Sequence, residues 1–233
     1  MAFSAFQYEH RLVAFIDILG WSAACEDPNK LNTVAKIATD LKTLPVAYSE
    51  DFKNKLTTIP GASLSVDHQH TELMTFSDCL AISTSTDVDC TLFFKFLTIV
   101  CRDLLTQGFL TRGGVTVGEL CHAENMIFGP ALIEAVKLER EAIYPRLLCS
   151  HDLVQHADGQ QKPNVIIKDH LGRDVINLLA FVSGNNPLQW ADLESSIDRN
   201  SAELKAKQEW KNLEKWHFMR DVLQAMVHSV SAS

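Results

Sequence analysis

The sequence has no surplus of basic residues. Its 233 residues include 21 lysines and arginines against 29 aspartates and glutamates, which gives a net charge of −8 with histidine neutral. Binding to nucleic acid needs a basic surface that neutralises phosphates, so we expect no nucleic-acid partner. An acidic chain can still bind a polyphosphate at one site where a divalent metal ion supplies the positive charge.

A long apolar run is also missing. The longest stretch without a charged residue, 175–191, contains Gly184 and Pro187 and is no candidate for a membrane span. The first twelve residues, MAFSAFQYEHRL, contain no apolar core of the length found in signal peptides. We therefore expect a cytoplasmic protein that has no membrane partner.

The six cysteines include no pair at C-x-x-C spacing, so neither a zinc site nor a redox dithiol is predicted from them. We expect reduced cysteines that mostly pack as small apolar side chains. The sequence shows no internal repeat and no low-complexity segment. With 46% apolar and 21% charged residues it has the composition of an ordinary globular chain, which excludes a disordered chain and a coiled-coil rod.

Apolar patterning predicts alternating strands and helices. Residues 12–18 are typical of a buried strand, and residues 31–41 repeat apolar side chains at helical spacing. The order strand, helix, two adjacent strands, helix, strand is the split pattern of ferredoxin-like folds, so the predicted class is α/β, more narrowly α+β. The other predicted elements are strands at 72–77, 79–83, 110–120, 146–149, 165–167 and 175–182, helices at 90–105 and 130–142, and a long helix or helix pair at 191–228.

Two aspartates interrupt apolar strands. Asp17 lies near the end of the first strand, and Asp78 lies at the join of the next two. Taken alone, Asp17 could be a strand-end or helix-capping residue and Asp78 a hairpin-turn residue. In the predicted strand order, however, the first strand and the hairpin can lie side by side. The two carboxylates would then repel each other unless a cation lies between them, and a divalent metal pair that binds a nucleoside triphosphate is the natural solution.

Four motifs carry a resemblance to a known family. They are F-I-D-I-L-G-W at 15–21, F-S-D at 76–78, R-G-G-V-T-V-G at 112–118 and F-G-P-A-L-I-E-A-V-K-L-E at 128–139. In this order they resemble class III nucleotidyl cyclases, most closely the pyrimidine cyclases of bacterial Pycsar antiphage systems. The resemblance covers roughly residues 10–150. It implies a cyclase domain at 1–185 with a ferredoxin-like βααββαβ core, and a C-terminal helical extension at 186–233 that packs on the same domain.

The resemblance also implies a site. Asp17 and Asp78 would bind two Mn²⁺ or Mg²⁺ ions, with the main-chain carbonyl of Ile18 as a further ligand, and Arg112 would face phosphate. The backbone of residues 19–21 would lie along the triphosphate. The nucleotide contacts implied in this way are Phe15, Leu19, Gly20, Trp21, Met74 and Met126.

The sequence departs from the family at four positions. Purine cyclases of this class read the base with polar residues where this chain has Met74 and Met126, although both methionines could equally fill gaps in the core. Loss of both polar contacts argues against ATP and GTP. The catalytic Asn and Arg of the family helix are replaced by Ile133 and Lys137, and lysine cannot bind phosphate bidentately.

The resulting hypothesis is a homodimeric uridylate cyclase that makes cyclic UMP for antiphage defence and acts through an effector that binds the cyclic nucleotide. A cytidylate cyclase is the nearest alternative. A non-catalytic, cyclase-like nucleotide sensor is the alternative from another class, and a purine cyclase with different base contacts is a third.

Overall fold

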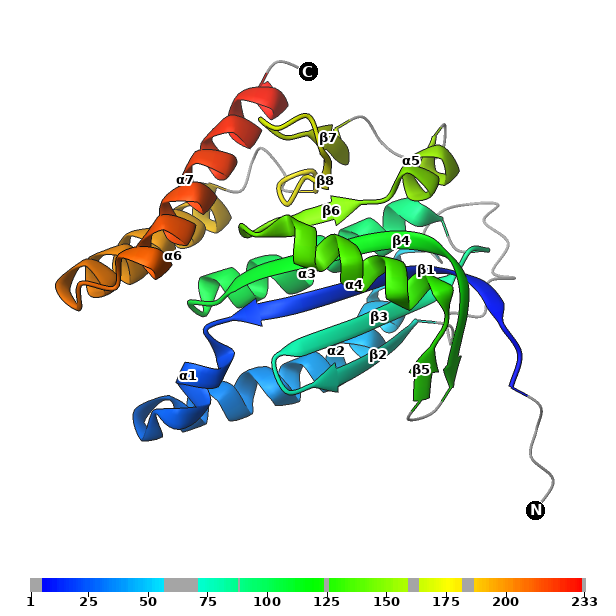
Figure 1. Ribbon diagram of the computed structural model, residues 1–233, viewed down its shortest axis with the longest axis horizontal. Coiled ribbons are helices and arrows are strands. Elements are labelled where there is room, and N and C mark those ends of the chain that lie inside the picture. The colour runs from blue at the N-terminus through cyan, green and yellow to red at the C-terminus, as the bar shows by residue number, and fades with distance from the viewer. Residues whose placement is uncertain are drawn as a thin grey trace.

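The computed structural model describes residues 6–56, 71–87, 89–123, 126–158, 164–181 and 187–231. Its centre is a mixed sheet with the strand order β2-β3-β1-β4-β6-β8-β7, and β5 pairs with β4 as a separate hairpin (Figure 1). The strands are β1 (Glu9–Leu19), β2 (Glu72–Phe76), β3 (Cys79–Ser85), β4 (Leu110–Ala123), β5 (Met126–Phe128), β6 (Leu147–Cys149), β7 (Ile166–Lys168) and β8 (Asp174–Ile176).

The first part of the sheet has ferredoxin-like topology. β1 pairs antiparallel with β3 on one side and with β4 on the other, and β2 pairs antiparallel with β3. With the helices α1 (Trp21–Glu26), α2 (Leu31–Leu56) and α3 (Cys90–Thr106), the element order is βααββαβ. The predicted α+β class is therefore confirmed, and so is the predicted adjacency of the first strand and the hairpin.

Alternation along β1 explains why this apolar strand carries an acid. Side chains of a strand point in turn to opposite faces of the sheet. Leu12 and Ile16 belong to the main core, which includes residues of α2 and α3, whereas Val13 and Phe15 pack with residues of α4 (Pro130–Ala142). Asp17 has the parity of Val13 and Phe15, so its carboxylate lies on the α4 face, near the end of that helix.

Helix α4 approaches β4 unusually closely. A Cβ added at Gly114 would lie 2.2 Å from the carbonyl oxygen of Ala135 and 2.5 Å from the Cβ of Leu138. Only glycine leaves room for this contact. Gly114 of the R-G-G-V-T-V-G motif thus acts in packing, because it lets α4 lie close against β4.

The C-terminal region is a helix pair. Helices α6 (Pro187–Ala206) and α7 (Trp210–Ser231) pack on each other, and α6 also contacts α3. Figure 1 shows the pair at the end of the sheet where β1 leads into α1. On α7, Phe218 stacks on Tyr144 with ring centroids 4.8 Å apart, and the Tyr144 hydroxyl donates to Glu214. These contacts tie α7 to the end of α4.

Some details differ from the predictions. The strand expected at 175–182 is only three residues long, because the chain turns at Asn177, whose side-chain oxygen accepts from the N–H of Leu179. Helix α5 (His151–Ala157) begins at a Ser150 cap and was not predicted. The predicted boundary at 185/186 lies outside the described residues. Within the described part of the chain, no helix is both long and apolar enough to cross a membrane.

Candidate active site

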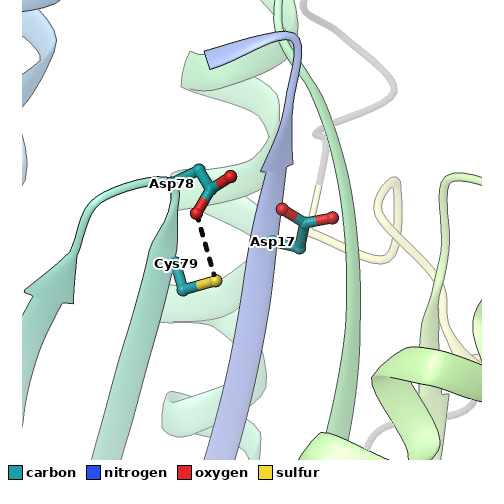
Figure 2. Close-up of side chains that lie close together, drawn as sticks. All are labelled: Asp17, Asp78 and Cys79. Carbon is teal, nitrogen blue, oxygen red and sulfur yellow. Dashed lines mark hydrogen bonds between the residues drawn. The ribbon is translucent and has the colours of Figure 1, made fainter. Parts of the chain in front are cut away.

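The structure brings Asp17 and Asp78 together. The carboxylates of both residues and the thiol of Cys79 offer ligand atoms that lie within 4.8 Å of one another (Figure 2). The backbone fixes this arrangement, because Asp17 is in register with Cys79 and the N–H of Ile18 donates to the Asp78 carbonyl at 2.7 Å. The hairpin thus holds one acid against the strand that carries the other.

Opposing effects act on the pKa of the Asp17 carboxyl. Burial raises its pKa above the usual value, the guanidinium of Arg112 lowers it, and the negative charge of Asp78 raises it further. Two carboxylates at this separation favour a shared cation. The positive charge that Asp17 contacts in this structure comes from Arg112.

Arg112 pairs with two acids from different elements. Its Nη2 donates to Asp17 at 2.8 Å and lies 2.6 Å from a carboxylate oxygen of Glu139 on α4. Asp17 and Arg112 are register partners on β1 and β4, so their side chains share a sheet face. Arg112 thus lies beside Asp17 and contacts carboxylates, while its contact with phosphate stays a prediction. Glu139 was not singled out in the sequence, because its role depends on where α4 lies.

Cys79 is the other residue that sequence reasoning missed. Burial raises the pKa of its thiol to about 12, with the charges of Asp78 and Asp17 adding to the effect. The thiol is therefore protonated at neutral pH, and it lies 3.6 Å from an Asp78 oxygen to which it can donate. Its position directly after Asp78 at the start of a strand was the only signal in the sequence.

The donor set fits a hard divalent cation. Mg²⁺ and Mn²⁺ prefer carboxylate and carbonyl oxygens, which Asp17, Asp78 and the main chain at Ile18 can provide. A protonated thiol is a poor ligand for such an ion, so Cys79 is better regarded as a neighbour of the site. A cation between the two carboxylates would also relieve the repulsion that contributes to the raised pKa of Asp17.

The two methionines that are predicted to read the base lie in different parts of the sheet. Register aligns Phe15 with Ala81 and Ala81 with Met74, so these side chains form a row across the sheet, one row away from Asp17. Met126 instead pairs with Ala123, at the end of β4 remote from Arg112, and is 44% exposed. The base-reading role of the two methionines stays a prediction.

The β1–α1 turn has an open backbone at Gly20. Gly20 has a φ of 88°, a left-handed value that favours glycine, and a Cβ added there would meet no atom within 4 Å. Leu19 is half-buried at the end of β1. Trp21 is buried, with its ring 5.6 Å from that of Phe109, so its backbone alone faces the turn.

Two replaced family positions lie on the outer face of α4. Ile133 is 59% exposed, and Lys137, one turn later, lies 3.5 Å from Glu134 with its side chain largely in solvent. The charged group that Lys137 contacts is thus Glu134 on its own helix. His122 lies on β4, where it is buried beside Ser83.

Comparison with known proteins gives a distant likeness only. No protein-family model and no curated protein matches the chain. It is similar to the guanylyl cyclase domain of the RhoGC fusion protein from the fungus Blastocladiella emersonii, with a TM-score of 0.45 and 12% identity over 73% of this chain and 95% of that one. It is also similar to the guanylate cyclase domain of RhGC from Catenaria anguillulae, solved with GTP, with a TM-score of 0.44 and 13% identity over 73% and 96%.

A third similar structure is the adenylate/guanylate cyclase/hydrolase from Silicibacter pomeroyi, with a TM-score of 0.38 and 14% identity over 73% of this chain and 95% of that one. Likeness at this level does not assign an activity. The functional argument therefore depends on the residues of this chain.

Proposed function

We propose that this chain is a nucleotidyl cyclase that converts UTP to 3′,5′-cyclic UMP and pyrophosphate. The observation that carries the proposal is the pair of carboxylates from Asp17 and Asp78, held within 4.8 Å by adjacent strands. The pair lies just before the open turn at Gly20, which leaves space for a ligand beside the acids. The motifs that resemble class III cyclases contain these same residues.

Each residue has a defined role in the proposed reaction. Asp17, Asp78 and the Ile18 carbonyl would hold the two metal ions, and the backbone of residues 19–21 would follow the triphosphate. When bound, two divalent ions lower the pKa of the ribose 3′-hydroxyl and neutralise phosphate charge. Arg112 lies beside Asp17 and would face the phosphates once a cation has replaced it as the partner of that carboxylate.

The finer parts of the proposal rest on the sequence motifs. They are the pyrimidine substrate, with CTP as the alternative to UTP, the use of Mn²⁺ or Mg²⁺, a cytoplasmic role in antiphage defence, and an effector that binds the product. An apolar residue at position 74, in line with Phe15, is consistent with a base that is not read by charged groups.

A homodimer is part of the proposal. In the family that the motifs resemble, the site forms between two subunits. Large apolar side chains are exposed on several elements of this chain, and a second copy would cover such surface. They include Phe76, Met126, Phe128 and Ile133, which are 42%, 44%, 41% and 59% exposed.

Product identification tests the proposal directly. The protein is incubated with each of the four nucleoside triphosphates and Mn²⁺, and the product is identified by mass. Cyclic UMP or cyclic CMP as the main product supports the proposal. Absence of any cyclic nucleotide, from protein that is folded and loaded with Mn²⁺, contradicts it.

One observation favours a non-catalytic nucleotide sensor as the second candidate. The positions of the family's Asn and Arg carry Ile133 and Lys137, so two groups that act on the transferring phosphate are absent there. A sensor would bind a triphosphate without turnover. The retained acid pair argues for the cyclase, because binding alone does not require activation of a hydroxyl group.

A further inference from the structure

A pocket of about 450 Å³ lies beside the candidate active site. Part of the lining is formed by Leu19, the last residue of the strand that carries Asp17, and by Gly20 directly after it. Another part is formed by α6 and α7, including Lys215 and Trp216. The C-terminal helix pair, which contains none of the family motifs, therefore covers the turn along which the triphosphate is proposed to lie. The volume is in the range of small-molecule sites.

Lys215 is a half-buried cation that faces this pocket. Among the described residues, no carboxylate lies within ion-pair distance of its ammonium group. Burial lowers its pKa, the nearby charges of Arg112 and Lys211 lower it further, and the charge of Asp17 partly compensates. The ammonium is thus close enough to interact with both Asp17 and Arg112. An anion in the pocket would satisfy a cation that the protein leaves unpaired.

The other charges of the lining balance one another, so Lys215 gives the pocket a net positive charge. The pocket has four cationic side chains, Lys30, Arg199, Lys207 and Lys215, and three acidic ones, Asp27, Glu203 and Glu209. The acids already have partners. Lys207 pairs with Glu203 at 2.6 Å, and Asp27 and Glu209 accept hydrogen bonds from Asn29 and Asn212. Lysine is a common point-charge ligand of phosphate.

We propose that this pocket binds the pyrophosphate end of the nucleoside triphosphate and that the Lys215 ammonium contacts it. The inference rests on the proposed function and assigns to the C-terminal helix pair a direct part in the site. It also supplies a basic residue in place of Lys137, which is exposed and paired with Glu134.

The role of Lys215 follows from the charge balance of the reaction. The ribose 3′-oxygen forms a bond to the α-phosphorus, and the bond from that phosphorus to the bridging oxygen breaks. The electron pair stays on the departing pyrophosphate, and the 3′-hydroxyl proton passes to solvent. A cation fixed next to the leaving group stabilises the charge that develops there.

Binding of inorganic pyrophosphate to the metal-free protein tests this role without turnover. Calorimetry in the presence of a chelator would compare the wild type with Lys215→Met and Lys215→Arg. Lys211→Met is the matched control, since Lys211 is exposed one turn earlier on α7 and does not line the pocket. Loss of one charged contact of ~1.5–3 kcal/mol should weaken binding by ~10-fold or more. We expect little change for the control and near-retention for Lys215→Arg.

A second readout separates binding from folding. Trp216 lines the same pocket, so its fluorescence should respond to pyrophosphate in every variant that binds it. Equal affinity of the wild type and a folded Lys215→Met would overturn the inference, as would a wild type that does not bind pyrophosphate. Binding that depends on Lys215 in a protein without cyclase activity would keep the anion pocket and overturn the cyclase proposal.

Discussion

The guanidinium of Arg112 donates to the Asp17 carboxylate and simultaneously pairs with Glu139 on α4. It therefore supplies positive charge to a cluster in which Asp17 and Asp78 repel each other. In the metal-free protein the guanidinium of this arginine partly neutralises Asp17, as a bound cation would. Metal binding and the position of Arg112 should consequently be coupled.

Replacement of Arg112 tests this coupling. Arg112→Ala leaves Asp17 and Glu139 unpaired, with side-chain exposures of only 15% and 9%. We expect a loss of about 3 kcal/mol in unfolding free energy, the low end of the range for a broken buried pair. Because a cation would replace the lost charge, Mn²⁺ should raise the melting temperature more in this variant than in the wild type. Thermal unfolding with and without Mn²⁺ measures both effects.

The control for that measurement is Arg140→Ala. It removes an exposed arginine that directly follows Glu139 on α4. It should change neither the stability nor the response to Mn²⁺. Equal Mn²⁺ responses of the wild type and Arg112→Ala would show that the arginine and the metal do not share a carboxylate.

The two aspartates should be indispensable for turnover. Asp17→Ala and Asp78→Ala are each expected to lower cyclic nucleotide formation to ~1% or less, since loss of even an outer partner of a metal ligand costs ~10–100-fold. Both variants should keep the fold, because removing one acid also removes the repulsion between the pair. Asp87→Ala, at an exposed turn, is the control. Rates are measured by mass spectrometry, and more than a few per cent of wild-type activity in either variant contradicts the metal role.

Base selectivity tests the position of the methionines. If Met74 lies at the base, as its alignment with Phe15 allows, adenine would leave polar groups desolvated and unpaired at ~1–3 kcal/mol each. UTP or CTP should then have kcat/KM values at least ~10-fold above those of ATP and GTP. Comparable rates with ATP would place the methionines away from the base and favour the purine-cyclase alternative.

His122 should make stability depend on pH. Burial, assisted by the charge of Arg11, lowers its pKa to about 4. Arg11 donates to the Ser83 hydroxyl, so that hydroxyl is free to donate its own hydrogen to Nδ1 of a neutral His122. Since the folded pKa lies below the unfolded value of about 6.5, the unfolded state binds more protons between these pH values. The contribution of neutral His122 to the unfolding free energy is therefore fully present above pH ~6.5 and is lost as the pH falls toward 4.

Urea unfolding at a series of pH values measures this effect. Between pH 7 and pH 4.5 the unfolding free energy of the wild type should fall by about 2 kcal/mol more than that of His122→Asn. The asparagine amide can accept the hydrogen bond but does not titrate. Parallel pH curves for the two proteins would mean that the pKa of His122 is the same in the folded and unfolded states.

The close contact of α4 with β4 predicts that alanine is much more destabilising at Gly114 than at Gly118. Gly114→Ala places a methyl group 2.2 Å from a backbone oxygen of α4 and should cost about 3 kcal/mol or more. Gly118→Ala meets the Ala131 side chain at 3.4 Å, an ordinary contact, and should cost less than ~1 kcal/mol. Denaturant unfolding compares the two variants. A tolerated Gly114→Ala would show that α4 can move away from the sheet.

The acid pair could be predicted from the sequence because two local features determined it. An acid near the end of an apolar strand and an acid in the following hairpin meet whenever the strands have ferredoxin-like order. Glu139 and Lys215 could not be found in this way. Their positions depend on how α4 and α7 pack on the sheet, and an isolated acid or lysine in an amphipathic helix carries no such signal.

Errors in the short elements have a similar cause. The strand at 175–182 was overestimated because an apolar run does not reveal the Asn177 turn that ends it. Helix α5 is only seven residues long, too short for apolar periodicity to distinguish it from a loop. The strands around Asp17 were predicted at the right places, whereas the helix predicted at 31–41 continues to Leu56.

The position of Asp17 on the central strand affects which motions can disrupt the site. Asp17 has register partners on both sides, Cys79 and Arg112, so its backbone is held by two neighbouring strands at once. The strands β2 and β7 at the sheet edges have one neighbour each and can fray separately. Local opening should thus reach β2 and β7 before it reaches Asp17. Amide hydrogens at the end of β1 should exchange only through cooperative opening of the sheet, so their protection should approach that of global unfolding.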